Sequence, residues 1–553
     1  MMNIAKAVVL AIFCSSSLAI VAQTTKDEAI KKTLNERYES AEADLNELIA
    51  REPNNAELYH AAGDNYLYWG EMDKAEAMYR KGMEVAATNP LNYAGLGRVA
   101  WIRGDALVNT TQFAKAVEIM GARSNKVPKP IQQLTYLKMA EVYLQHENKN
   151  LEKALEYINN ALNLDENNPE VYVQLGEYYS ERDGINLTNA LMQYNRALEK
   201  NPKYTRALLR KGVVHVKIAA WDDGLNYFNE IIAIDPTFAP VYREKAELLY
   251  KAGRYTQAVE AYAKYLELNN SCRVQQRYAS FIFLTKDYKK AGEELEKAMQ
   301  CNSSSPYLYR LLGYTYFESG DYTRSQEYLD KFMEMAKANG KPKIDGYDLG
   351  YQGKLLAKAG QDSLALLKIN EAISADSNYV DGYGELAAIY QKQKKYDMAA
   401  AHYQKKIEKN KEPVLLDYYY LGTNRYYNKE FKAADDAFAM CEKKYPDATF
   451  WRGRCNNRME LDYEHPVGLG KPFFENYITR IGKEAKAIES NKKFLTEAYS
   501  YLGFQYFATG NYNCSKAAYY KVLEMDAAHV NATKALTDSL MVIAIPDSCA
   551  LLP

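Results

Sequence analysis

The sequence predicts an all-α protein, a right-handed α-solenoid of stacked helical hairpins. Asn168 to Pro236 contains two units of one pattern, each with a helical segment, a turn, a second helical segment and a proline. The closing prolines, Pro202 and Pro236, are 34 residues apart, and a fixed period of this size is typical of repeat architectures. Small and aromatic residues also recur at fixed places in each unit, which indicates one hairpin packed many times over.

The first of these units resembles the tetratricopeptide repeat. The resemblance rests on its aromatic positions, its Leu-Gly pair, its alanines and its closing proline, here Tyr172, Leu175, Gly176, Tyr179, Ala190, Tyr194, Ala197 and Pro202. The second unit departs from the pattern with His215 at a tyrosine position and Gly224 at the first alanine. Small residues let paired helices approach closely, and proline ends the second helix. Because one hairpin cannot bury its apolar face alone, neighbours are expected on both sides.

Composition fits a folded protein that does not depend on phosphate contacts. The chain has 553 residues, of which 47% are hydrophobic and 25% charged, as in ordinary globular proteins. Its formal charge of -1 argues against a nucleic-acid partner. Tyrosine is abundant, with 49 residues against 16 phenylalanines and 4 tryptophans, and tyrosine suits surfaces where water meets an apolar core.

Residues 1–22 are predicted to be a cleaved signal peptide. Lys6 precedes an apolar run, and Ala22 closes a plausible cleavage site. Cys14 raises the alternative of a lipoprotein, but bulky Phe13 stands where a lipobox has a small residue. No later run is apolar enough for an integral membrane span. We therefore expect a periplasmic or secreted protein, with a peripheral place in a membrane complex left open.

The repeats are expected to fill residues 23–529 in about 14 units. After the first, the predicted units begin near Ala56, Pro90, Gln133, Asn168, Lys203, Ala239, Cys272, Pro306, Gly346, Val380, Leu415 and Thr449, and the last full unit follows. The unit at 449–495 is degenerate, with a longer connection that contains Pro466 and Pro472. Residues 530–553 are expected to form a capping helix and a tail, since a terminal repeat would otherwise expose its apolar face.

Six cysteines remain after the leader, and an even number behind a signal peptide suggests disulfides. Helical-hairpin geometry selects one pairing of the six. Residues that open the first helix and close the second lie side by side, and residues equally far from a turn also meet. The predicted bridges are Cys272–Cys301, Cys441–Cys455 and Cys514–Cys549, against the alternative of six buried thiols.

No catalytic motif is complete. The segment GYDLGYQGKLL approaches a phosphate-binding loop, but Asp348 replaces its first glycine and Leu355 its Ser/Thr. No histidine pair has the spacing of a helical zinc site. Glu464 and His465 form the one polar pair that would suit a hydrolase, against a solvated loop. We therefore expect no enzyme, no cofactor and no metal site.

The concave face is the remaining candidate for function. In the family that this chain resembles, the first helix of each unit lines that face. The residues expected there for partner binding are Arg243, Glu247, Arg310, Tyr314, Lys354 and Tyr419. The pairs Arg243 with Glu247 and Arg310 with Tyr314 do not match the carboxylate clamp of heat-shock co-chaperones.

The leading hypothesis is a non-catalytic scaffold of the cell envelope that binds peptide or helix segments of envelope or secreted proteins. The alternative is a glycan- or peptidoglycan-binding protein with tyrosines as stacking platforms. Two DSL triplets, at Ser363 and Ser539, resemble the O-glycosylation sequon of the Bacteroidetes. Together with the segment GLGKPFFENYI, they make the chain similar to periplasmic tetratricopeptide proteins of that phylum.

Overall fold

The computed structural model describes residues 24–145, 147–184, 187–462, 466–481, 489–538, 541, 546 and 549. The expected leader, the Glu464–His465 pair and Ser539 lie outside the described residues. Every regular element within these ranges is a helix. The chain divides into two compact units, Met1–Ser303 (unit 1) and Ser304–Pro553 (unit 2).

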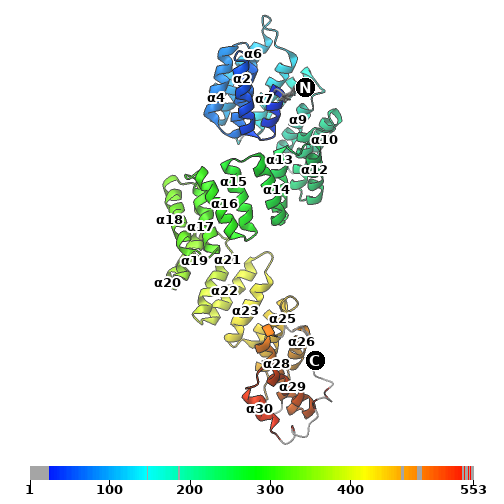
Figure 1. The fold of residues 1–553 in the computed structure, drawn as a ribbon, viewed down its shortest axis with the longest axis vertical. Helices are drawn as coiled ribbons and strands as arrows, with labels where there is room; N and C mark the ends of the chain where they lie inside the picture. The colour runs from blue at the N-terminus through cyan, green and yellow to red at the C-terminus, as the bar shows by residue number, and fades with distance from the viewer. Residues whose placement is uncertain are drawn as a thin grey trace, which may run out of the picture. The chain divides into compact units, whose positions relative to one another are not determined.

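Unit 1 consists of consecutive helix pairs, each helix packing against the next (Figure 1). Its helices are α1 (Lys26–Leu34), α2 (Tyr38–Arg51), α3 (Ala56–Trp69), α4 (Met72–Val85), α5 (Pro90–Ile102), α6 (Ala106–Gly121), α7 (Lys129–Gln145), α8 (Leu151–Leu164), α9 (Pro169–Arg182), α10 (Thr188–Lys200), α11 (Thr205–Lys217), α12 (Trp221–Ile234), α13 (Ala239–Lys251), α14 (Tyr255–Leu268), α15 (Cys272–Leu284) and α16 (Tyr288–Cys301). The pairing follows the predicted period, so this part of the chain is an α-solenoid.

Unit 2 continues the same pattern with one longer connection, between α25 and α26. Its helices are α17 (Pro306–Glu318), α18 (Tyr322–Asn339), α19 (Gly346–Lys358), α20 (Asp362–Ala375), α21 (Asp381–Lys392), α22 (Tyr396–Lys409), α23 (Leu415–Tyr427), α24 (Phe431–Cys441), α25 (Pro446–Arg458), α26 (Lys471–Ile481), α28 (Lys492–Ala508), α29 (Tyr512–Met525) and α30 (Val530–Leu536). Within α30, Ala532 is buried against Tyr519 and Val522 of α29. The helix therefore covers the last hairpin, and it ends at Leu536.

The hairpins are held together by an aromatic ring that lies on glycine. Tyr79 of α4 is fully buried, and a Cβ atom added to Gly63 or to Gly95 would lie 2.4 Å from its ring. In the same way, a Cβ atom on Gly176 would lie 2.2 Å from the ring of Tyr194. The glycine of the Leu-Gly pair is therefore needed because the ring occupies the space of a side chain.

The first hairpin of unit 1 contacts residues some two hundred positions later. Lys31 of α1 forms an ion pair with Asp235 (Nζ to Oδ2 2.9 Å) in the turn before α13. Glu36, between α1 and α2, accepts a hydrogen bond from the Tyr265 hydroxyl of α14 (2.7 Å) and pairs with Arg243 of α13. The repeats from α1 to α14 thus follow a superhelix that brings the first hairpin into contact with α13 and α14.

Asp235 should make this contact sensitive to acid. Burial alone would raise the pKa of Asp235, but hydrogen bonds from Lys31 and Thr237 outweigh burial and lower the pKa from 3.8 to about 2. Because its pKa is lower in the folded state, ionised Asp235 stabilises the folded protein at pH values above its ordinary pKa. This stabilisation is lost as pH falls toward 2. We expect pepsin to cleave the α1–α2 hairpin increasingly fast as pH falls from about 4 to about 2.

An Asp235→Asn variant provides the control for that prediction. It lacks the ionisable group, so its cleavage at α1–α2 should be fast throughout that range once pepsin's own pH dependence is subtracted with an unfolded substrate. Equal pH profiles for the variant and the wild-type protein would contradict the assignment to Asp235.

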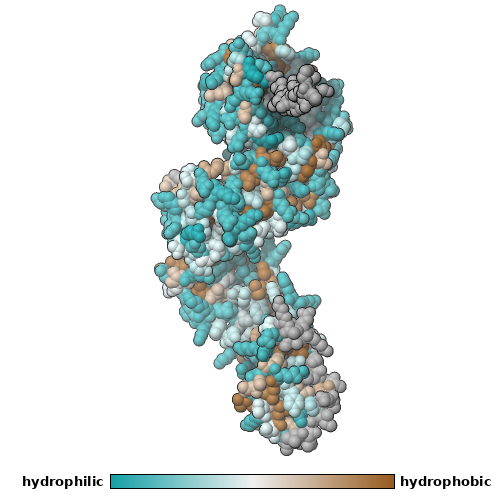
Figure 2. All heavy atoms as spheres, viewed as in Figure 1, coloured by the Kyte–Doolittle hydropathy of each residue, from teal (hydrophilic) through white to brown (hydrophobic). Residues whose placement is uncertain are grey.

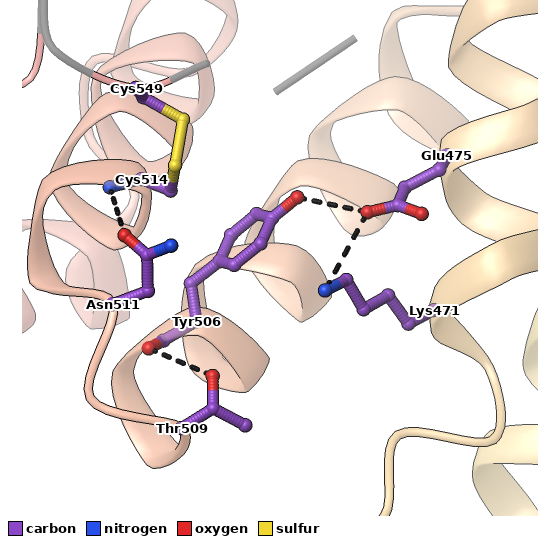
Figure 3. Close-up of a disulfide and its surroundings, with 7 residues drawn as sticks. All are labelled: Lys471, Glu475, Tyr506, Thr509, Asn511, Cys514 and Cys549. Carbon is purple, nitrogen blue, oxygen red and sulfur yellow. Dashed lines mark hydrogen bonds and ion pairs between the residues drawn. A yellow bond between two sulfur atoms is a disulfide. The ribbon is translucent and has the colours of Figure 1, made fainter. Parts of the chain in front are cut away.

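Two disulfides are present. Cys272 opens α15 and Cys301 closes α16, with Cα atoms 5.6 Å apart. Cys514, in the first turn of α29, is bonded to Cys549, with Cα atoms 4.8 Å apart (Figure 3). In Figure 3 the backbone N–H of Cys514 donates to the Asn511 side chain (3.3 Å), which caps α29. The second bridge ties the C-terminal tail to the last hairpin.

The prediction of a third bridge, Cys441–Cys455, is wrong. Cys441 and Cys455 are buried free thiols, and the Cys441 sulfur donates to the carbonyl oxygen of Phe438 in its own helix (3.4 Å). Equal distances from a turn bring two backbones near each other but do not orient the sulfur atoms. Burial raises the pKa of Cys441 to about 11 and that of Cys455 to about 12, so both remain protonated thiols at neutral pH.

The long connection of the degenerate hairpin is organised by one carboxylate. Glu460 is buried, and its carboxylate oxygens accept hydrogen bonds from the backbone N–H groups of Val467 (3.2 Å), Gly468 (2.9 Å) and Leu469 (3.1 Å). Three backbone donors satisfy the buried charge that would otherwise be costly. These hydrogen bonds tie residues 467–469 of the connection to Glu460, just after the end of α25.

Candidate functional site

The inner wall of unit 1 carries a buried network of paired charges. Arg98 of α5 donates to Asp64 of α3 (Nη1 to Oδ1 2.7 Å) and to Glu141 of α7 (Nη2 to Oε2 3.1 Å). Lys138 of α7 pairs with Asp64 (2.7 Å), and the Tyr68 hydroxyl donates to Glu141 (2.7 Å). Asp64, Arg98 and Glu141 are all less than 9% exposed. The two carboxylates and the two cations of this network therefore neutralise one another.

The pKa shifts in this network follow from the pairing. Burial opposes ionisation of Asp64, but Lys138 and Arg98 hold its pKa well below the ordinary 3.8. Burial likewise opposes ionisation of Glu141, and the same two cations lower its pKa. Both carboxylates therefore remain charged across the physiological range and require their partners.

Two predicted partner-binding residues of unit 1 form ion pairs within the protein. Arg243 pairs with Glu36 and with Glu244 (3.1 Å). Glu247 accepts two hydrogen bonds from the Arg277 guanidinium (2.9 and 2.8 Å). Arg243 thus joins α13 to the first hairpin, and Glu247 joins α13 to α15 of the next repeat, so both predicted residues are occupied within the protein.

Unit 2 contains a groove of different character. It has a volume of 370 Å³ and lies between residues of successive repeats from α17 to α23. Its lining combines tyrosines, carboxylates and amines, namely Glu318, Tyr347, Tyr351, Lys354, Tyr379, Asp381, Gly384, Glu385, Ala388, Tyr403, Lys406, Asp417 and Tyr420. A concave surface with aromatic walls and a few polar groups is the usual form of a binding site.

Capping and glycine contacts position the α19 side of this groove. Asp345 caps α19 by accepting from the N–H groups of Tyr347 (2.9 Å) and Asp348 (3.2 Å), and Asp348 accepts in return from Asp345 N–H (2.8 Å). This capping box fixes the start of the helix. A Cβ atom on Gly350 would lie 2.2 Å from the Tyr379 hydroxyl oxygen, so glycine here lets Tyr379 lie against α19.

The amines of the groove are held by carboxylates of adjacent helices. Lys354 of α19 lies 3.2 Å from Glu318 and 3.9 Å from Glu385, and its Nζ is 4.1 Å from the Tyr351 ring centre. Lys406 of α22 lies 3.0 Å from Asp417 and 3.4 Å from Asp381. Burial lowers the pKa of Lys406, but the two carboxylates outweigh burial and raise it. Both amines therefore form ion pairs within the protein.

The tyrosines of the groove fall into two groups. Tyr379 and Tyr403 are less than 9% exposed, and burial raises their pKa, so they form the floor as neutral groups. Tyr347 and Tyr420 are 44% and 36% exposed. The Tyr347 ring meets Tyr379 edge-on, with ring centres 4.9 Å apart. The exposed pair can contact a ligand, and the buried pair supports it.

Of the partner-binding residues predicted in unit 2, one lines this groove and the others do not. Lys354 lines it, whereas Arg310 and Tyr314 both bind Asp348 of the next repeat (2.8 and 2.6 Å). The Tyr419 hydroxyl accepts from the Trp451 indole N–H (2.9 Å), away from the groove lining. Ser363 is exposed in the first turn of α20, where it is accessible to modification.

Most groove residues were not among those predicted. Tyr403 and Lys406 come from α22, a second helix, and Tyr379 comes from the turn before α21. From the sequence, only the first helix of each unit was expected to line the concave face. The density of tyrosines between residues 347 and 420 was the signal that could have pointed to this segment.

Metal and membrane sites are not evident in the described part of the chain. Among those residues, no three His, Cys, Asp or Glu side chains come together as metal ligands. Within the same ranges, each helix is too short or too polar to cross a lipid bilayer. On the faces that Figure 2 shows, hydrophobic residues lie in small groups between hydrophilic ones.

The fold is an α-solenoid, and unit 2 has a groove between its repeats. Models of the tetratricopeptide repeat match residues 56–89, 239–272, 307–339 and 383–414. Helix pairs recur at the same period along the described residues. The chain therefore contains tetratricopeptide repeats in both units.

Several known proteins are similar to parts of this chain. A TPR repeat-containing protein of Methanocaldococcus jannaschii is 25% identical over 393 residues, covering 67% of this chain and 61% of that protein. Human tetratricopeptide repeat protein 13 is 25% identical over 145 residues, covering 25% of this chain and 16% of that protein. The chain therefore spans less than two thirds of either relative.

Among solved structures, the C-terminal part of a TPR repeat-containing protein from Cytophaga hutchinsonii is similar. It is 28% identical with a TM-score of 0.41, and the match covers 48% of this chain and 100% of that one. Tetratricopeptide repeat proteins are generally non-catalytic scaffolds that bind peptide segments of other proteins.

Proposed function

We propose that this protein is an interaction scaffold of the cell envelope that binds an extended segment of a partner protein in the groove of unit 2. The observation that carries the proposal is the contrast between the two inner walls. In unit 1 the inner wall is neutralised by its own buried ion pairs. In unit 2 it forms a groove with exposed tyrosines. Exposed aromatic side chains in a concave surface are common anchors for a partner.

The envelope location is part of the proposal. It is supported by the leader that the sequence predicts and by the Cys272–Cys301 and Cys514–Cys549 bonds, because disulfides persist in oxidising compartments. Immunoblotting of fractionated cells with and without reducing agent would test the location. Recovery in the cytoplasmic fraction with free thiols would overturn it.

A peptide ligand suits the groove better than a stacked sugar. Sugar binding needs open aromatic faces, but Tyr379 and Tyr403 are buried in the floor and the Tyr347 ring meets Tyr379 at 72°. Glycan binding is the alternative, and a pull-down of the protein with immobilised glycans would reveal it.

A photo-crosslinker placed at the groove tests the proposal. We expect a benzoylphenylalanine residue at Tyr347 to capture a partner polypeptide in envelope extracts, because this side chain is 44% exposed at the groove. The same residue at Tyr520, which is 43% exposed on α29, is the matched control. Adding Gly384→Phe, which fills the groove, should abolish capture at Tyr347. Capture that is equal at both sites, or unaffected by Gly384→Phe, would count against the groove.

A further inference from the structure

We propose that the groove of unit 2 selects a positively charged side chain, lysine or arginine, in the segment that it binds. This inference rests on the proposed function and names the chemistry of its ligand. The proposal depends on the balance of charge in the groove, on one buried carboxylate oxygen that lacks a partner, and on the tyrosines beside them.

The groove carries more negative than positive charge. Its lining has the carboxylates of Glu318, Asp381, Glu385 and Asp417, against the amines of Lys354 and Lys406 only. A concave surface with low-dielectric walls concentrates the field of such an excess. A cation is therefore attracted into the groove, and an acidic segment or a chain-terminal carboxylate is repelled.

The two amines do not satisfy all four carboxylates. Lys354 lies closer to Glu318 than to Glu385, at 3.2 Å against 3.9 Å. Burial raises the pKa of Glu385; Lys354 and Lys406 lower it, but the charges of Asp381 and Glu318 act with burial, and the pKa stays above its ordinary value. Glu385 is thus the least compensated carboxylate of the groove, and an incoming cation would stabilise its charged form.

Asp417 supplies an independent observation. Its side chain lines the groove and is only 4% exposed. Lys406 contacts its Oδ1 atom, while Oδ2 is buried with no hydrogen-bond partner among the described residues. A buried acceptor without a donor is destabilising. A ligand that brings several N–H donors, as guanidinium and ammonium groups do, would supply the missing bond after a small shift of the groove wall.

The aromatic and glycine positions suit a long cationic side chain. Tyr347 and Tyr420 are exposed beside the carboxylates, so they can pack against the aliphatic stem and the cationic head. Gly384 leaves space on α21, where the three atoms nearest to an added Cβ all belong to the flexible Lys406 side chain, the closest at 3.3 Å. A volume of 370 Å³ accommodates a side chain and its flanking backbone rather than a folded domain.

Three capped decapeptides with a Gly/Ser background test the inference on the full-length protein. They carry arginine, citrulline or glutamate at the same two central positions. Citrulline keeps the shape of arginine without its charge. By fluorescence anisotropy at low salt, we expect the arginine peptide to bind about fivefold to tenfold more tightly than the citrulline peptide. The glutamate peptide should bind most weakly, and added salt should reduce the difference.

Variants assign the preference to the groove. Glu385→Gln should reduce the difference between arginine and citrulline, and Glu385→Lys, which leaves three carboxylates against three amines, should abolish it. Glu334→Gln is the matched control, because Glu334 is 70% exposed on α18 and pairs with Lys331 of its own helix. It should leave the preference unchanged.

Several outcomes would overturn the inference. Equal binding of the arginine and citrulline peptides would show that charge is not selected. The same loss in Glu334→Gln as in Glu385→Gln would show that the effect is not local. Failure of all three peptides to bind at about 1 mM, a range in which weak contacts are still measurable, would also overturn it. None of these outcomes affects the crosslinking at Tyr347, which tests the proposed function separately.

Discussion

Replacing Arg98 by methionine is expected to destabilise unit 1 by about 3–5 kcal/mol. Arg98 is 2% exposed and bridges Asp64 and Glu141 on two other helices. Methionine fills a similar volume but leaves two buried carboxylates with one amine, that of Lys138. Because isolated buried charges are costly, the loss exceeds that of an ordinary surface pair.

Hydrogen exchange of the full-length protein would measure this effect, because a repeat array need not unfold in one step. We expect amides of α3, α5 and α7 to lose protection, while α15 and α16 change little. Arg80→Met is the control, since Arg80 is 63% exposed and pairs with Glu76 of the same helix. It should change stability by less than about 0.5 kcal/mol. If both variants lose the same stability, the buried network contributes no more than an exposed ion pair does.

The hairpins could be predicted because their causes are local. Gly176 and Tyr194 lie in one hairpin, and their contact is repeated by Gly63 and Tyr79, so a residue pattern of one period contains the information. The contact between Glu36 and Arg243 could not be predicted in this way. It depends on a small rotation added at every repeat, and the sequence pattern does not specify that rotation closely enough to bring two distant side chains together.

The candidate site was predicted less well than the fold. Lys354 lies in the groove, but Arg310 was expected to be free and instead binds Asp348 of the next repeat. Such pairs between repeats depend on the register of neighbouring helices. The structure also explains the glycines of GYDLGYQGKLL. Gly350 and Gly353 lie against Tyr379 and Ile369, so they serve close packing and not phosphate binding.

Replacing Tyr379 by alanine is expected to destabilise the α19–α21 region by about 3–5 kcal/mol. Tyr379 is 4% exposed, and its ring fills the space above Gly350 and Gly382. Neither glycine has a side chain that could move into the cavity, so little relaxation is expected. The loss should appear as faster hydrogen exchange in α19 and α21 of the full-length protein, together with loss of peptide binding.

The Tyr347→Ala variant tests whether this side chain contacts the ligand without being needed for the structure of the groove. Tyr347 is 44% exposed and touches Tyr379 only edge-on, so its removal should change stability by less than about 1 kcal/mol. Binding of the arginine peptide should nevertheless weaken, because an exposed aromatic contact with the ligand is lost. If Tyr347→Ala destabilises the region as much as Tyr379→Ala does, the exposed ring is part of the core. If it leaves peptide binding unchanged, the ligand lies elsewhere in unit 2.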